Sequence, residues 1–153
     1  MINSSTGEIK FDDYDLIVHP ELSLSQFQNA GLSISDSYSS GEDGWTRYSF
    51  KSCLDGLVGD FMVFFRRGKI HMLDCQPLAG AKGEDWCDVS SVEQQRLLDD
   101  WLVKTMRGPG PYEYAWGEIS SSRDIKTGEY SIVVLYQREL VERAERNKRA
   151  IHH

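Results

Sequence analysis

The residues that come closest to a metal-binding cluster are His71, Asp74 and Cys75. Because side chains alternate along a strand, His71 and Cys75 would point to one face and Asp74 to the other. Two ligands on one face leave a tetrahedral metal site incomplete. We therefore expect no metal and no cofactor, and we interpret His71 as a partly buried histidine beside core residues.

The cysteines Cys53, Cys75 and Cys87 are the other candidates for chemistry. Lys51 shares a strand face with Cys53 and could lower the pKa of its thiol, but no histidine is placed to act as its base. The serines lack the G-x-S-x-G pattern of a hydrolase. We expect all three cysteines to act as small apolar side chains, and we expect no enzymatic activity.

The charged residues point to a different kind of function. The chain has 17 Lys and Arg against 24 Asp and Glu, a formal net charge of −7. Residues 1–136 carry the excess, with 12 basic and 21 acidic side chains, whereas residues 137–153 carry 5 and 3. A body with this charge repels phosphate backbones and attracts a basic protein. We therefore expect a protein partner and no nucleic acid.

Two predicted loops combine acidic residues with a tryptophan. An aromatic side chain ringed by charged ones is typical of a binding hot spot. For Trp86 we favour the structural interpretation, in which it packs over the start of the following helix as a hydrophobic staple, and Trp45 has the same two interpretations. The predicted partner-binding residues are Glu42, Asp43, Trp45, Glu84, Asp85, Trp86 and Asp88.

The clearest secondary-structure signal is an amphipathic helix over about 91–107, directly after the second of these loops. Ser90 and Glu93 have the spacing of a capping box, and Gly108 predicts the end of the helix. The apolar face that would pack on a sheet comprises Val92, Leu98, Trp101, Leu102, Thr105 and Met106.

The remaining pattern predicts strands. Residues 45–53 alternate in polarity, and the apolar runs 57–65 and 69–75 form a hairpin around Gly68. A second hairpin joins 114–122 to 129–136, short strands lie within 8–11 and 14–19, a short helix lies near 23–30, and 35–44 is an exposed loop. This order indicates an α+β fold with an antiparallel sheet of about six strands and helices on one face.

The domain organisation follows from a change in composition near residue 136. We expect residues 1–136 to form a single domain and 137–153 a charged C-terminal helical extension, whose last histidines resemble a tag remnant. The N-terminus lacks the pattern of a signal peptide, and no run of 18 apolar residues predicts a membrane span. Three cysteines without a C-x-x-C motif suit a reducing compartment, so we expect a cytoplasmic protein without membrane contact.

Several landmarks together resemble a known group of proteins. They are LIVHPELSLSQF at 16–27, Trp86-x-Asp88 before the helix, Asp100-Trp101-Leu102 inside it, Tyr114-x-Trp116-Gly117 after it, and Asp124-x-Lys126-x-Gly128 leading to 132–136. This arrangement, over about residues 14–136, resembles small cytoplasmic immunity proteins encoded beside bacterial polymorphic toxins, including contact-dependent growth inhibition systems. The resemblance implies a protein that binds a cognate toxin domain in a 1:1 complex and neutralises it.

Two alternatives belong to other classes. A small-ligand-binding protein or an enzyme would have a pocket between sheet and helix, lined by His19, His71 or Cys53. A structural or regulatory subunit would assemble through the charged C-terminal helix. An acidic inhibitor of a basic nuclease agrees best with the charge, because a negative surface can occupy a cleft that is built for phosphate.

Overall fold

The computed structural model describes residues 1–136, so the predicted C-terminal helix at 137–153 lies outside the described residues. The elements in chain order are β1 (Ile9–Lys10), β2 (Ile17–Val18), α1 (Leu24–Gln28), β3 (Asp36–Ser40), β4 (Trp45–Leu54), β5 (Leu57–Arg66), β6 (Lys69–Pro77), the short 3-10 helix η1 (Trp86–Asp88), α2 (Ser91–Met106), β7 (Tyr112–Tyr114), β8 (Gly117–Arg123) and β9 (Tyr130–Tyr136).

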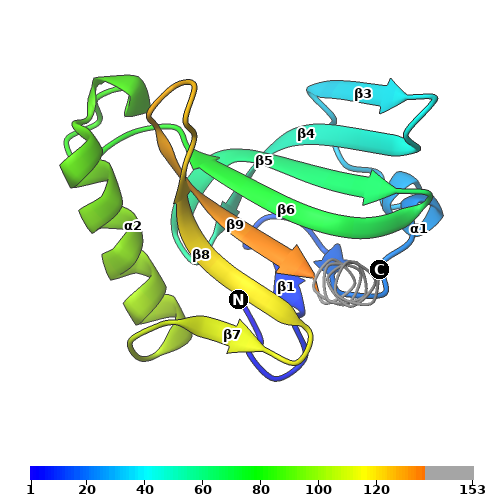
Figure 1. The fold of residues 1–153 in the computed structure, drawn as a ribbon, viewed down its shortest axis with the longest axis horizontal. Helices are drawn as coiled ribbons and strands as arrows, with labels where there is room; N and C mark the ends of the chain where they lie inside the picture. Colours follow the sequence, from blue (N-terminus) through cyan, green and yellow to red (C-terminus); the bar gives the residue numbers. More distant parts are fainter. Residues whose placement is uncertain (137–153) are drawn as a thin grey trace, which may run out of the picture.

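One antiparallel sheet of seven strands organises the described chain (Figure 1). Its strand order is β3-β4-β5-β6-β9-β8-β7, and β1 and β2 form a separate two-stranded sheet. The loop between β5 and β6 has two residues, Arg67 and Gly68, both with positive φ, as a tight hairpin requires. The predicted α+β architecture is therefore confirmed, with one strand more in the main sheet than the pattern indicated.

The prediction of an exposed loop over 35–44 is wrong for its first half. Asp36–Ser40 forms β3, which pairs with β4 in register from Asp36↔Ser49 to Ser40↔Trp45. Its Ser-rich sequence has low β-propensity, and all its residues are exposed or half-buried. The pairing therefore comes from the adjacent edge of β4, which is information that the local sequence does not contain.

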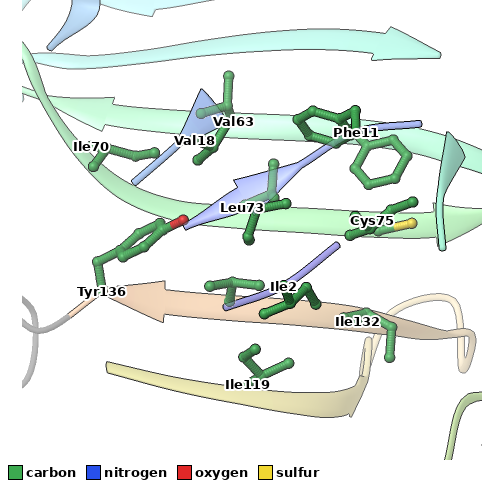
Figure 2. Close-up of a cluster of buried hydrophobic side chains, with 14 of the residues drawn as sticks. Ile2, Phe11, Val18, Val63, Ile70, Leu73, Cys75, Ile119, Ile132 and Tyr136 are labelled. Carbon is green, nitrogen blue, oxygen red and sulfur yellow. The ribbon is translucent and has the colours of Figure 1, made fainter. Parts of the chain in front are cut away.

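The hydrophobic core lies on one face of the sheet, which we call the inner face (Figure 2). The alternation predicted for β4 is confirmed, because Phe50, Ser52 and Leu54 are buried while the residues between them are half-buried or exposed. Elements outside the sheet cover this face and supply Ile9 from β1, Val18 from β2, Phe27 from α1 and Leu98 from α2. The inner-face core of the sheet itself comprises Phe50, Leu54, Phe61, Val63, Phe65, Ile70, Leu73, Cys75, Ile119, Ile132, Val134 and Tyr136.

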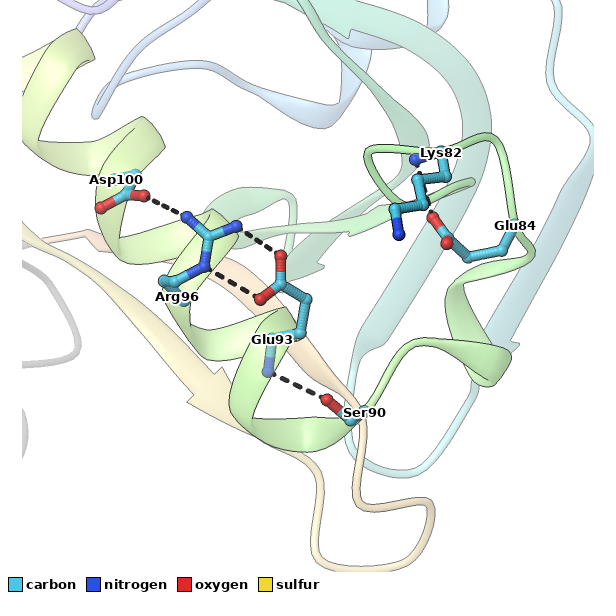
Figure 3. A network of polar contacts seen from close by, with 6 residues as sticks. All are labelled: Lys82, Glu84, Ser90, Glu93, Arg96 and Asp100. Carbon is cyan, nitrogen blue, oxygen red and sulfur yellow. Dashed lines mark hydrogen bonds and ion pairs between the residues drawn. The ribbon is translucent and has the colours of Figure 1, made fainter.

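Helix α2 matches its predicted span but not its predicted face. Leu98 and Leu102 are buried as expected, whereas Val92 is 80% exposed. Gln94, expected outside the apolar stripe, is 2% exposed. The capping box at Ser90 is half formed: the Ser90 hydroxyl accepts from the Glu93 N–H at 3.3 Å, but the Glu93 carboxylate pairs with Arg96 instead (Figure 3).

Candidate functional site

The acidic loop before α2 is anchored by Trp86. Its indole is 5% exposed, and its Nε1–H donates to the Tyr130 carbonyl at 2.9 Å. Trp86 therefore packs into the core, which corresponds to the structural interpretation of this residue. Asp85 and Asp88 on either side of it are exposed, whereas the Glu84 carboxylate turns back and accepts from the Lys82 N–H at 3.0 Å (Figure 3).

Gln94 connects this loop to both α2 and the sheet. Its Nε2 donates to the carbonyls of Trp86 at 2.7 Å and Val89 at 3.2 Å. Its Oε1 accepts from the backbone N–H of Tyr130 at 2.8 Å, at the start of β9. A buried amide with three such bonds holds the loop, the helix and the strand in one arrangement. The backbone of the loop that carries the exposed carboxylates is thus fixed relative to α2 and β9.

The hairpin tip between β8 and β9 lies beside this loop (Figure 1). Ser91 Oγ donates to the Gly128 carbonyl at 3.4 Å, which links the tip to the start of α2. Within the tip, the Gly128 N–H donates to the Asp124 carbonyl at 2.7 Å and the Lys126 N–H to Asp124 Oδ1 at 2.8 Å. These bonds hold Ile125 at the apex, where its side chain is 99% exposed.

We call the surface formed by Asp85, Asp88, Val92, Asp124 and Ile125 the acidic platform. Two of these side chains, Val92 and Ile125, are apolar and exposed. The negative charge here affects the exposed thiol of Cys87, whose pKa lies above its usual range. The largest cause is the charge of Asp88, followed by partial desolvation and the charges of Asp85 and Glu129. The cations closest in sequence are Arg123 and Lys126, which flank Asp124 and Ile125, followed by Lys82. Arg96 pairs with Glu93 and Asp100 and so offsets charge farther along α2 (Figure 3).

The other predicted contact residues lie elsewhere. Glu42 and Asp43 are exposed in the turn between β3 and β4, and Trp45 begins β4. The ten-residue strand β4 separates this turn from the end of the sheet that carries the acidic platform, a span of about 30 Å. The structure therefore divides the seven predicted residues into two groups at opposite ends of the sheet (Figure 1).

Trp45 stands on the sheet face opposite the core, which we call the outer face. Its ring meets His71 edge-on at 4.6 Å between centroids, and the Arg66 guanidinium lies 5.5 Å from its ring centre. Together with neighbouring strands it surrounds a shallow hollow of about 460 Å³. The hollow is lined by Tyr38, Ser40, Asp43, Trp45, Arg47, Phe64, His71 and Met72.

The side chains considered for chemistry do not converge. The prediction that His71 and Cys75 share a face is wrong: His71 lies on the outer face and Cys75 is buried in the inner-face core. The cause is a register irregularity in the β5–β6 pairing, at Phe64/Phe65, which changes the alternation of side chains along β6. Cys53 is half-buried, and its thiol donates to Asp12 Oδ2 at 3.1 Å. Cys87 is exposed, so only Cys75 of the three behaves as the buried apolar filler expected. Within residues 1–136, no three His, Cys, Asp or Glu side chains come together as metal ligands.

Asp74 is the one carboxylate of the outer face with a large perturbation. Burial raises its pKa to about 6, Ser131 Oγ lowers it by donating to Oδ2 at 3.2 Å, and the charge of Asp124 raises it again. Because the folded-state pKa exceeds the unfolded value near 3.8, the neutral acid is favoured by folding. The contribution of Asp74 to the free energy of unfolding is therefore complete below pH about 4, and it is lost as the pH rises through about 6.

Asp74→Asn should therefore stabilise the protein at pH 8 by about 1 to 3 kcal/mol, because about 1.4 kcal/mol accompanies each unit of pKa shift. The gain should fall towards zero near pH 4, where the aspartic acid is already neutral. Urea unfolding at both pH values measures the difference, with Asp43→Asn in an exposed turn as the matched control. Equal gains at the two pH values would contradict the burial of a charge at Asp74.

The sequence analysis missed Ile125 and Gln94. Ile125 carried a readable signal, since a lone apolar residue inside a turn of Arg, Asp, Lys, Thr and Gly has no core to enter. Gln94 carried none, because a buried glutamine is recognised only by the backbone groups that it meets in the folded chain.

Within residues 1–136, no helix combines the length and the apolar character needed to cross a membrane. Comparison of the chain with protein-family models, with curated proteins and with solved structures gave no match.

Proposed function

We propose that this protein acts as a binding protein of the immunity class, which neutralises a basic toxin domain, for example a nuclease, by contact with the acidic platform. The observation that carries the proposal is Ile125, a fully exposed apolar side chain in a turn whose backbone is fixed by hydrogen bonds to the adjacent Asp124. Isolated exposed apolar residues are ordinary on surfaces, but this one shares its surface with the 80% exposed Val92.

Charge and apolar contact would have different roles at such an interface. Asp85, Asp88 and Asp124 would steer a basic partner toward the platform and raise the rate of encounter. Ile125 and Val92 would lose water on contact, and burying an aliphatic side chain contributes roughly 1.5 to 3 kcal/mol. The hydrogen bonds of Gln94 and Trp86 already fix the loop in the free protein, so binding loses less conformational entropy. This division of roles agrees with an inhibitor and requires no catalytic group.

The test uses the toxin domain encoded by the neighbouring gene, purified and mixed with this protein. We expect a 1:1 complex in which Cys87, at the centre of the platform, is shielded from a neutral thiol reagent. Ile125→Ala should weaken the complex by roughly tenfold, because most of an apolar side chain is removed. Val103→Ala on the far end of α2, where the side chain is 47% exposed, is the matched control and should leave affinity unchanged.

Two results would count against the proposal. Binding that leaves Cys87 reactive would place the interface on another surface. If cells that express the toxin domain survive without this protein, the toxin needs no inhibitor and the proposed function is wrong.

A small-ligand pocket between sheet and helix has less support. The three residues expected to line it each contact a different part of the chain. His19 Nδ1 accepts from the Glu21 N–H, His71 packs against Trp45, and the Cys53 thiol donates to Asp12.

A further inference from the structure

One row of paired residues crosses the outer face of the whole sheet. Each residue in the row is the register partner of the next, so their side chains stand side by side at one level along the strands. The row runs from strand β3 to strand β7 through Tyr38, Arg47, Phe64, Met72, Leu135, Glu118 and Glu113.

The chemistry of this row changes steadily from one edge to the other. At the β3 edge the Arg47 guanidinium lies over the Tyr38 ring at 5.8 Å and also pairs with the exposed Asp36 carboxylate at 3.3 Å. The middle is apolar, with Phe64, Met72 and Leu135 all half-buried. The β7 edge is acidic, with Glu118 half-buried and Glu113 exposed.

An apolar strip in the centre of an outer face needs a covering layer or a partner. The described elements outside the sheet are used on the inner face, where α1 contributes Phe27, α2 contributes Leu98 and β1 contributes Ile9 to the core. The outer face also contains the hollow above Phe64 and Met72.

We propose that the outer face is a homodimer interface, in which a second copy of this chain stacks on the first about a two-fold axis parallel to the strands above β6. Rotation about this axis reverses the strand order while it keeps the level along the strands. Met72 then meets Met72 of the second copy, Phe64 meets Leu135, and Arg47 meets Glu118. At the ends of the row Tyr38 meets Glu113, where a hydroxyl can donate to a carboxylate, so the face is self-complementary, as a two-fold interface requires.

The dimensions indicate a weak dimer. Seven strands at about 4.8 Å spacing and three levels of outward side chains at about 7 Å give an area of roughly 700 Å² per copy. This is below the roughly 800 Å² per partner of a standard stable interface. One unfavourable contact is also expected, because Asp74 lies on β6 one level from Met72 and would approach its own copy across the axis.

This inference does not depend on the proposed function, since the hairpin end that carries the acidic platform lies at a different level of the sheet from the row that ends at Glu113. Sedimentation of the full chain from about 1 µM to about 1 mM should show a shift from monomer toward dimer. Arg47→Glu and Glu118→Arg should each abolish the shift, because each places like charges together. The double variant Arg47→Glu with Glu118→Arg should restore it, which loss of folding cannot explain. Asp74→Asn should increase the dimer fraction at a given concentration.

A chain that stays monomeric over the whole range would overturn the proposal and would mean that the face is covered by residues 137–153 or by another protein. A double variant that fails to dimerise while it unfolds like the wild type in urea would overturn it as well. Toxin binding by Arg47→Glu should equal that of the wild type, so loss of the dimer and loss of inhibition are separable outcomes.

Discussion

Replacing Asp85 and Asp88 together by lysine is expected to slow association with the basic partner by more than tenfold at low ionic strength. The double change reverses two charges of the acidic platform and so changes its net charge by four units. Electrostatic steering acts mainly on the association rate. Raising the salt to about 0.5 M shortens the Debye length to about 4 Å and should remove most of the difference. Stopped-flow mixing across a salt series measures both effects, and the dissociation rate should change far less.

The matched control for this experiment is Glu42→Lys with Asp43→Lys. It makes the same change in net charge at the opposite end of the sheet, about 30 Å away along β4. At moderate salt this distance exceeds the Debye length, so the control should slow association by less than about threefold. A larger effect at residues 42 and 43 would move the contact surface to the turn between β3 and β4. A rate that is insensitive to salt would exclude steering.

Replacing Gln94 by leucine is expected to lower the free energy of unfolding by about 3 to 5 kcal/mol. The change leaves the carbonyls of Trp86 and Val89 and the N–H of Tyr130 without their side-chain partner. Each buried polar group that loses its hydrogen bond costs about 1 to 3 kcal/mol. Urea unfolding followed by tryptophan fluorescence measures the loss, since the environment of Trp86 changes directly.

Gln95→Leu is the control for this change. It alters the same residue type one position later, on the exposed side of α2, and should shift stability by less than about 0.5 kcal/mol. Gln94→Glu keeps an acceptor for Tyr130 but loses both donors, so it should also destabilise the protein. A Gln94→Leu variant as stable as the wild type would show that water replaces the amide and that the platform needs no such support.

Alternation over 45–53 and apolar runs in the other strands made most of the sheet readable in advance. The strands β5 and β9 bury alternate side chains, as an extended backbone requires, whereas β6 departs from this period at His71 and Met72. The turn at Gly68 was equally legible, because few residues other than glycine adopt positive φ without strain. The short helix expected near 23–30 is present as α1, and Ser23 and Gln26 form a capping box at its start.

Short edge strands were not readable. β3 and β7 have five and three residues, and neither has a buried side chain that would give a periodic signal. They are strands because a neighbouring strand offers its unpaired backbone groups. Val92 was also misassigned: it was counted on the apolar face of α2 and yet is 80% exposed.

The amino-acid sequence by itself determined the fold class, the span of α2 and the acidic character of the body, because periodicity, capping chemistry and net charge are properties of the chain and do not depend on its path. Only the tertiary structure decided where the charges act. It separated Glu42 and Asp43 from Asp85 and Asp88 by the length of a strand, placed the hairpin tip that carries Ile125 against the start of α2, and put Arg47 and Glu118 at one level of the outer face. These relations depend on strand order and register, which are set by long-range pairing in the folded protein.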